Sequence, residues 1–318
     1  MTFAYLLAEA NQKFKKAKIK NPHLEAEILL SHVFKKTREY ILAYPEKKLS
    51  KKQLADFNNL ISRRTKGEPI AYLIGHKEFY GLKFKVNKNV LVPRPETELI
   101  VEEALKLTAY NSKPATFIDI GTGSGCIIIT LAKLLKNKKY SFLASDISKP
   151  ALNIAKQNAK ANNVDKKIKF FYGNLLSPFI KILDPRLRSP RCSIGEADGN
   201  DKRKKLLVQN SRLIIAANLP YLTSTQVKNS PSIQNEPKIA LVASNNGLKL
   251  YERLLEQIKC LIHNTKYIIQ NTFILCEFDP RQTTQLKKLI KKYLPQADIK
   301  IKKDLSGRNR LAIISFKN

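Results

Sequence analysis

The sequence predicts an α/β protein built on a doubly wound, mostly parallel sheet, with a small all-α domain in front of it. Three observations predict this fold. Residues 1–75 carry helix start and stop signals, residues 76–93 alternate apolar and polar side chains, and helical and strand patterns then alternate from residue 94 to 318. A length of 318 residues also favours a large α/β unit with a smaller partner domain.

The first region, residues 1–75, contains two clear helix starts. Asn21 followed by Pro22 is typical of a cap and a first helical position. Ser50 with Gln53 matches a capping box, and Gly67 lies where that helix is expected to end. These signals predict a small helical bundle.

Residues 76–93 are predicted to form a β-hairpin that links the two domains, because their apolar residues alternate around turn residues. In residues 94–318, helices are predicted at 97–108, 124–136, 149–162, 247–263 and 280–292, and strands at 116–120, 141–145, 167–172, 213–217, 266–274, 297–301 and 310–316. Residues 181–210 lack apolar periodicity, and we predict a flexible insertion there.

Bulk composition predicts a soluble cytoplasmic protein. Hydrophobic residues make up 43% and charged residues 26%, and no segment approaches the roughly 20 apolar residues of a membrane span. The cysteines are scattered without a C-x-x-C pair, so neither a disulfide framework nor a metal site is expected: Cys126, Cys192, Cys260 and Cys276. The net charge of +32 predicts attraction to anionic partners such as RNA or ribosomes, or reflects lysines on solvated surfaces.

The first chemical motif is a strand that runs into Gly121, Gly123 and Gly125 and then a helix. Glycines permit positive φ and close approach of a ligand, and the helix N-terminus offers free N–H groups. The Gly-x-Gly-x-Gly spacing differs from the dinucleotide fingerprint, which disfavours a nicotinamide-dependent oxidoreductase. Asp119, before the glycines, is suited to neutralise an ammonium group or to order the loop. Thr122 and Ser124 lie between the glycines.

The second motif is Asp146, which ends the next predicted strand. A carboxylate at that place accepts hydrogen bonds from the hydroxyls of a ribose. Together with the glycine loop, Asp146 predicts a nucleoside cofactor, and the residues before the glycines suit the amino-acid end of S-adenosylmethionine better than a pyrophosphate.

The third motif is the tetrapeptide Asn218–Tyr221, which follows a buried-looking strand. The Asn218 side-chain oxygen and the Leu219 carbonyl can accept both N–H groups of a planar NH₂ group. Pro220 stiffens the Leu219 carbonyl, and Tyr221 offers an aromatic face to a flat substrate. The motif therefore predicts methyl transfer to an amide or exocyclic amino nitrogen by alignment of the two reactants.

These motifs resemble those of the release factor glutamine methyltransferase family, within the class I methyltransferase superfamily. The resemblance covers nearly the whole chain outside the predicted insertion. The segments that carry it are Val92–Glu98, Asp119–Cys126, Asp146–Ser148, Asn218–Tyr221 and Asn235–Pro237. It implies a Rossmann-like methyltransferase domain with a helical N-terminal domain that holds the substrate. It also implies methylation, with S-adenosylmethionine, of N5 of the glutamine in the Gly-Gly-Gln loop of class I peptide chain release factors.

Carried over by position, the resemblance implies three sets of site residues. Cofactor contacts fall on Asp119, Gly121, Thr122, Gly123, Ser124, Gly125, Asp146, Asn174 and Asn218. Catalytic and glutamine contacts fall on Asn218, Leu219, Pro220 and Tyr221, with Arg94, Glu96 and Thr97 as walls of the substrate site. No metal and no membrane contact are implied, and we expect a monomer.

The sequence departs from the family at Leu219, where a second proline is usual, and at Asn174, where aspartate is usual. The segment before strand 213–217 also lacks the usual Phe-Asp lead-in. Two alternatives remain open. First, the tetrapeptide Asn-Leu-Pro-Tyr and the basic net charge also fit an RNA adenine-N6 methyltransferase. Second, these departures from the family pattern, together with the basic charge, fit a weakly active copy of the fold that binds RNA or ribosomes.

Overall fold

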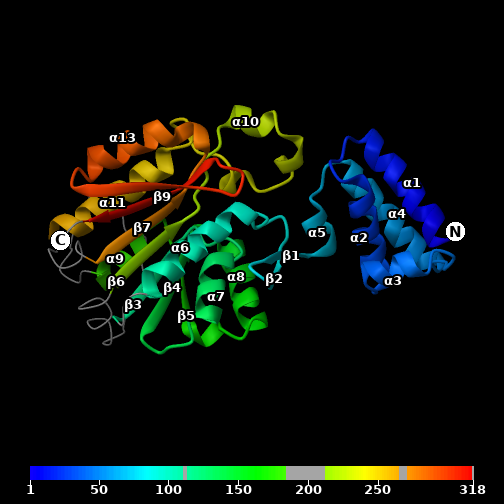
Figure 1. Ribbon diagram of the computed structural model, residues 1–318, viewed down its shortest axis with the longest axis horizontal. Coiled ribbons are helices and arrows are strands. Elements are labelled where there is room, and N and C mark those ends of the chain that lie inside the picture. The colour runs from blue at the N-terminus through cyan, green and yellow to red at the C-terminus, as the bar shows by residue number, and fades with distance from the viewer. Residues whose placement is uncertain (110–112, 184–211, 265–270, 317–318) are drawn as a thin grey trace.

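The computed structural model describes residues 1–109, 113–183, 212–264 and 271–316. Its N-terminal helices form a separate group at one end of the long axis of the molecule (Figure 1). They are α1 (Phe3–Lys16), α2 (Pro22–Phe34), α3 (Arg38–Ala43), α4 (Lys51–Thr65) and α5 (Ile70–Ile74). A hydrophobic core of their own holds them together, with Phe3, Phe14, Leu29, Leu30 and Phe57 fully buried.

The predicted helix starts in this group are present. Ser50 and Gln53 form a reciprocal capping box at α4, so two backbone N–H groups of the first turn have partners. Asn21 precedes Pro22 as the cap of α2, although its side chain makes no capping hydrogen bond.

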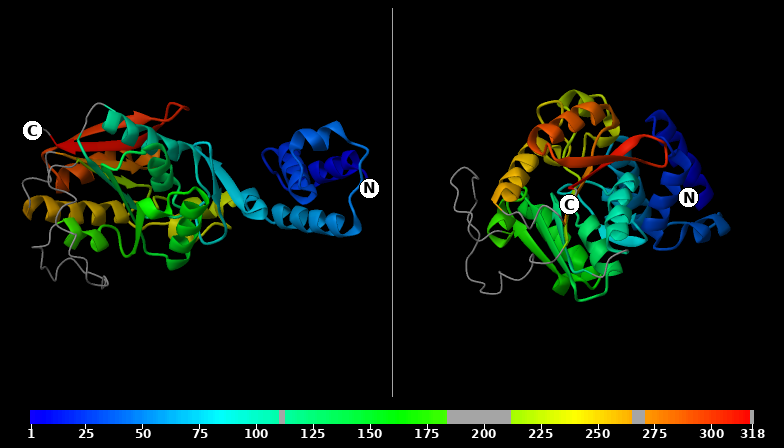
Figure 2. Two further views of the ribbon diagram at one scale, coloured as in Figure 1. Left: turned by 90° about the horizontal axis from the view of Figure 1, so that it is seen from below. Right: turned by 60° about the vertical axis from the view of Figure 1, so that its left-hand side comes forward.

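The predicted hairpin follows as β1 (His76–Phe79) and β2 (Leu82–Lys85), which pair antiparallel. Beyond it, Val86, Val90 and Val92 are buried against Ala151 and Ile154 of α8 (Lys149–Ala161). This contact ties the connecting segment to the larger body, and the second view shows the connection running between the two groups (Figure 2).

The described residues of the larger body contain a seven-stranded sheet in the order β5-β4-β3-β6-β7-β9-β8. The strands are β3 (Ala115–Ile120), β4 (Tyr140–Asp146), β5 (Ile168–Tyr172), β6 (Arg212–Ala217), β7 (Thr272–Glu277), β8 (Ala297–Lys303) and β9 (Asn309–Phe316). The neighbouring strands β5, β4, β3, β6 and β7 all run parallel to one another. Strand β9 is antiparallel to both of its neighbours, β7 and β8. The predicted doubly wound, mostly parallel sheet is confirmed.

Helices cover both faces of this sheet. The core on one face includes residues of α6 (Glu98–Ala109), α7 (Cys126–Leu134) and α8, and the other includes residues of α9 (Ser177–Leu183), α11 (Lys249–Asn264) and α13 (Thr283–Tyr293). Phe117 points into the first core and Ile118 into the second, as the two-residue period of a strand requires. All six residues of β3 are buried, as expected for a parallel strand covered on both faces, and Asp119 is its one charged residue.

Some predicted elements differ from the structure. Residues 266–270 of the strand predicted at 266–274 lie outside the described residues. The described strand ends at Glu277, because the apolar pattern continues through Cys276 to a buried carboxylate. Helices α9 and α10 (Ser224–Lys228) were not predicted, since both are short. Short 3₁₀ turns occur at η1 (Pro95–Thr97), η2 (Asp165–Lys167), η3 (Pro231–Ile233), η4 (Lys238–Ala240) and η5 (Pro280–Gln282).

The predicted insertion at 181–210 lies almost entirely outside the described residues, and its first three residues end α9. Among the described helices, none combines the length and the apolar character that a membrane span requires.

Candidate active site

The centre of the sheet is the point where the order of the strands reverses. The chain runs outward from β3 through β4 to β5, then returns to place β6 on the other side of β3. Open α/β sheets bind ligands in the crevice beyond the carboxyl ends of the strands at such a point. The loops after β3 and β6 are the glycine loop and the tetrapeptide, and a Cβ atom on Gly121 would lie 3.2 Å from Leu219 Cδ2. The two predicted motifs are therefore neighbours.

The glycine loop is held by its own backbone and by β4. The N–H groups of Gly121 and Thr122 both donate to the Ser145 carbonyl at 2.9 Å. Gly125 caps α7 with φ +82°, and a Cβ atom there would lie 2.6 Å from Ile129 Cδ1. A side chain at that position would meet both backbone strain and a packed neighbour.

Asp119 lies beneath this loop and is buried. Its Oδ2 accepts a hydrogen bond from the Thr122 hydroxyl at 2.6 Å, while Oδ1 has no hydrogen-bond partner among the described residues. Burial raises the pKa of Asp119 to about 7, and the nearby charge of Asp146 acts in the same direction. Of the two roles expected for Asp119, its contact with Thr122 serves to order the loop.

Asp146 ends β4 and faces the crevice. Its Oδ2 accepts from the Gly123 N–H and its Oδ1 from the Ser148 N–H, both at 2.8 Å. Burial raises the pKa of Asp146, and these hydrogen bonds oppose that shift. A carboxylate oxygen has more than one lone pair, so Asp146 can still accept hydrogen bonds from a ligand.

A cavity of about 380 Å³ opens at these loops. The predicted residues that line it are Arg94, Thr97, Gly121, Thr122, Gly123, Ser124, Asp146, Asn174, Asn218, Leu219 and Pro220. Asp119 and Gly125 do not line it, and they support the loop from beneath. The cavity thus collects residues from segments scattered between positions 94 and 220 of the chain.

A second cavity, of about 230 Å³, lies beside the first. Its lining includes Tyr221, Asp279 and Arg310, and it shares Arg94 and the residues Asn218–Pro220 with the larger cavity. Glu96 lines neither of the two. Because the tetrapeptide borders both cavities, ligands in the two would meet at its backbone.

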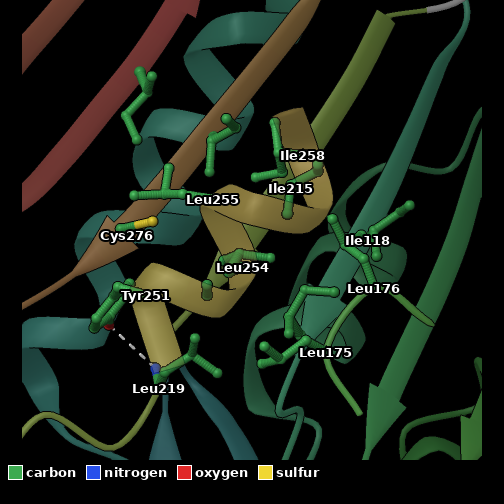
Figure 3. Packing of buried hydrophobic residues seen from close by; sticks show 14 of the residues in the cluster. Ile118, Leu175, Leu176, Ile215, Leu219, Tyr251, Leu254, Leu255, Ile258 and Cys276 are labelled. Carbon is green, nitrogen blue, oxygen red and sulfur yellow. Dashed lines mark hydrogen bonds between the residues drawn. The ribbon is translucent and has the colours of Figure 1, made fainter. Parts of the chain in front are cut away.

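Three residues of the tetrapeptide, Asn218, Leu219 and Tyr221, have hydrogen-bond partners among the described residues. The Asn218 Nδ2 donates to Thr97 Oγ1 at 2.9 Å, and the Leu219 N–H donates to the Tyr251 hydroxyl at 3.3 Å (Figure 3). The Tyr221 hydroxyl donates to Glu277 Oε1 at 3.1 Å. No described residue donates to Asn218 Oδ1 or to the Leu219 carbonyl, so these two acceptors remain available to a substrate.

Three of the supporting residues were not found from the sequence. Tyr251 and Gln282 belong to distant helical segments, and Gln282 Nε2 donates to the Tyr221 carbonyl at 2.9 Å. Glu277 carried a usable signal, because it is a carboxylate at the carboxyl end of a parallel strand. The prediction that this strand ended at 274 hid that signal.

Comparison with known proteins identifies the family. Residues 5–75 match the model of the PrmC N-terminal domain, and residues 97–180 match that of ribosomal protein L11 methyltransferase (PrmA). The release factor glutamine methyltransferase of Nitratidesulfovibrio vulgaris is 31% identical over 97% of this chain and 93% of its own length. That of Buchnera aphidicola is 34% identical over 93% of this chain and 92% of its own. The chain belongs to the release factor glutamine methyltransferase family.

Among solved structures, the catalytic domain of human Mettl16 in complex with the MAT2A 3′UTR hairpin 6 is 18% identical, with a TM-score of 0.49, over 85% of this chain and 83% of that one. Within the release factor glutamine methyltransferase family, Leu219 stands where the sequence resemblance implies proline. The structure accommodates it, because its side chain is buried and lies close to Gly121.

Proposed function

We propose that this chain transfers a methyl group from S-adenosylmethionine to the N5 amide nitrogen of the glutamine in the Gly-Gly-Gln loop of class I peptide chain release factors. The observation that carries the proposal is the position of Asn218 and Leu219. They border both cavities, and each keeps one acceptor without a partner among the described residues. The family membership favours glutamine over the adenine that the tetrapeptide alone also fits.

The larger cavity fits the methyl donor. Its volume of about 380 Å³ lies within the range of small-molecule sites, and it lies at the carboxyl ends of β3 and β4. Asp146 offers acceptors for ribose hydroxyls, and Asn174 offers an amide oxygen for an adenine amino group. When bound, S-adenosylmethionine supplies an electrophilic methyl group on its sulfonium.

The smaller cavity fits the acceptor. An amide nitrogen is a weak nucleophile, since its lone pair is delocalised into the carbonyl. Asn218 Oδ1 and the Leu219 carbonyl accept the two N–H groups, which holds the nitrogen in line with the methyl group and raises its electron density. Tyr221 lines this cavity and offers its ring to the flat amide. The proton becomes acidic only after the methyl group has arrived, so no general base is required beforehand.

The walls of the site are held by an ion pair. Arg94 bonds to Glu236, and Glu236 also accepts from the Val92 N–H at 3.0 Å. This arrangement links the segment before α6 to the segment that follows the tetrapeptide, and Arg94 lines both cavities. We include Arg94 and Thr97 in the substrate site, with Glu96 outside the two cavities as a neighbour.

We further propose that residues 1–75 form a domain that holds the release factor and that residues 94–318 form the methyltransferase domain. Residues 76–93 connect these two domains. A separate hydrophobic core within the first region supports this division. The two regions approach each other at Gly67, where a Cβ atom would lie 2.9 Å from Asn235 Nδ2. Asn235 precedes the buried Glu236, so a partner held by the helices lies near the walls of the site.

We place the enzyme in the cytoplasm as a monomer. Within the described residues Cys126 and Cys276 are buried free thiols, which supports a reducing compartment. As a secondary proposal, the basic side chains of the chain contact ribosomal RNA. In that case we expect the affinity for RNA to fall steeply as the salt concentration rises.

The test is an incubation of the protein with labelled S-adenosylmethionine and either a class I release factor or ribosomal RNA. We expect label in the release factor, located by mass spectrometry on the glutamine of the Gly-Gly-Gln loop. A release factor with that glutamine changed to alanine is the control and should remain unlabelled. Label in RNA alone would reject the glutamine acceptor.

A further inference from the structure

A second arginine borders the smaller cavity, and the proposed function does not yet use it. Arg310 lines that cavity together with Tyr221 and Asp279. It belongs to β9, and its side chain is only 14% exposed. Arg310 is absent from the lining of the larger cavity. It therefore adjoins the site that we assign to the acceptor, apart from the site that we assign to the methyl donor.

The pairing of β9 with β7 brings Arg310 to this edge of the sheet. The two strands are antiparallel, with Glu277 opposite Leu311, and the Phe278 N–H donates to the Arg310 carbonyl at 3.0 Å. Because β7 runs parallel to β6, the carboxyl ends of both strands lie at the same edge. Figure 1 shows the red turn between β8 and β9 at the end of the sheet nearest the N-terminal helices.

The turn between β8 and β9 holds the guanidinium of Arg310. Its Nε donates to Asp304 Oδ2 at 3.2 Å. The other oxygen, Asp304 Oδ1, accepts from the N–H groups of Ser306 and Arg308 at 3.0 Å and from the Ser306 hydroxyl at 2.6 Å. The Asp304 side chain is only 6% exposed. Both of its oxygens have partners, so the turn fixes the carboxylate against which Arg310 rests.

The charged groups that line the smaller cavity differ in what they leave for a ligand. Asp279 accepts two hydrogen bonds from the Arg281 guanidinium, and Arg94 donates from Nη2 to Glu236. Arg310 uses only Nε, so the N–H groups of its two terminal nitrogens donate to no described residue. A mostly buried cation gains from a further acceptor, because burial removes it from water. Arg310 can therefore supply strong donors to a ligand in this cavity.

The proposed acceptor limits what these donors can bind. The residues before the glutamine in a Gly-Gly-Gln loop have no side chains, so an enzyme can hydrogen-bond them only through their main-chain N–H and C=O groups. A guanidinium carries donors and no acceptor, so it selects the C=O groups. Hydrogen bonds from a charged donor are also stronger than those from a neutral one.

Building on the proposed function, we propose that Arg310 is a substrate-binding residue that donates from its terminal nitrogens to a main-chain carbonyl of the glycines before the acceptor glutamine. Asp304 is a positioning residue that holds the guanidinium at the cavity. Arg310 thereby fixes the main chain of the acceptor loop, while Asn218 and the Leu219 carbonyl hold the amide at the end of the glutamine side chain.

The experiment compares Arg310→Gln with the wild-type enzyme on a class I release factor. We expect kcat/KM to fall by about 20-fold, because a hydrogen bond from a charged group is lost. The loss should be in KM, since the contact is made to the glycines and not to the reacting amide. The kcat at saturating release factor and the Kd for S-adenosylhomocysteine should stay within about threefold of wild type.

A second variant, Arg310→Lys, keeps the positive charge. An ammonium is a point charge without the fork of a guanidinium, so it cannot serve Asp304 and a carbonyl in the same way. We expect a KM between those of the wild type and Arg310→Gln. In Asp304→Asn, an NH₂ group can replace the oxygen that accepts from Arg310, and we expect KM to rise by about fivefold because a charge-assisted bond is lost.

Arg308→Gln is the matched control, because it removes the same charge from the same turn. Arg308 is exposed and is absent from the lining of both cavities. We expect its KM for the release factor to stay within about twofold of wild type at ~0.15 M salt, where exposed charges are screened.

An unchanged KM in Arg310→Gln would overturn the inference, and a fall of Tm and kcat without a rise of KM would assign Arg310 to the fold alone. An equal rise of KM in Arg308→Gln would show that only the charge of the turn matters. The wild-type reaction separates this inference from the proposed function. If the wild-type enzyme fails to label the release factor, both are rejected. If it labels the release factor and Arg310→Gln keeps the wild-type KM, only the inference is rejected.

Discussion

The glycine loop and the tetrapeptide occupy equivalent places, each beyond the carboxyl end of a central parallel strand, yet they are held in different ways. The glycine loop has one contact within itself, from Thr122 to Asp119 three residues away, and is otherwise held by Ser145 and Asp146 of β4, the next strand along the chain. The tetrapeptide is held by Thr97, Tyr251 and Glu277, at sequence separations of 121, 32 and 56 residues. The glycine spacing marks the first loop in the sequence, whereas no sequence pattern marks the distant side chains that hold the tetrapeptide.

The difference predicts that the tetrapeptide is the part least tolerant of change. Asn218→Ala removes the side-chain acceptor altogether, and we expect kcat to fall about 10³-fold, the upper range for one preorganised group. Affinity for S-adenosylhomocysteine, measured by calorimetry, should change little. Unchanged turnover would remove Asn218 from the reaction.

The second largest effect is expected at Gly247, which lies under the tetrapeptide. A Cβ atom there would lie 1.9 Å from the Tyr221 carbonyl oxygen, so Gly247→Ala must displace the Tyr221 backbone. We expect kcat/KM to fall about 100-fold, because small misplacements of reacting groups are costly. The Tm should also fall, since Gly247 has φ +83°.

Gly307→Ala is the matched control for Gly247→Ala. Gly307 has φ +80°, but a Cβ atom there meets nothing within 4 Å. This variant therefore adds the backbone strain without the clash, and we expect a lower Tm with kcat/KM close to wild type. Equal losses of activity in the two variants would show that strain alone accounts for the effect at Gly247.

A smaller effect is expected on the cofactor side. Asp146→Asn keeps the shape of the side chain but removes the charge that strengthens its hydrogen bonds with Gly123 and Ser148. We expect the Kd for S-adenosylmethionine to rise about tenfold, or ~1.4 kcal/mol. The kcat at saturating cofactor should remain near wild type, and a large fall in kcat would show that the two loops are not independent.

The smallest expected effect is a change of stability with pH. It is expected for both loops, because a buried carboxyl group lies under each. Burial raises the pKa of Asp119 from 3.8 and that of Glu277 from 4.5, both to about 7. The folded state therefore holds protons that the unfolded chain releases at lower pH. Their contribution to stability is fully present below about pH 4 and is lost as the pH rises through about 7.

We expect these two carboxyl groups to lower the Tm of the wild-type protein by a few degrees between pH 5 and 8. In a protein of this size, a loss of about 1 kcal/mol in the free energy of unfolding lowers the Tm by ~2–4 °C. Asp119→Asn and Glu277→Gln should each flatten that decline when Tm is measured by calorimetry. An unaltered slope in either variant would show that its carboxyl does not titrate in this range.

Much of the fold was predictable from the sequence because it depends on local patterns. The period of apolar residues placed nearly every strand and helix of the second domain, and the Ser50–Gln53 capping box was read correctly. Two short helices were missed, and the end of β7 was placed three residues early. Short apolar stretches of this kind carry too few periods to separate helix, strand and loop.

The sequence by itself determined the residue types that the chemistry requires: the glycines, Asp146 and the tetrapeptide, each next to a strand that its own apolar run defines. The tertiary structure alone decided which side chains hold the tetrapeptide. The physical reason is that Thr97, Tyr251 and Glu277 lie far apart in the sequence and become its hydrogen-bond partners only when η1, α11 and β7 pack around the end of β6.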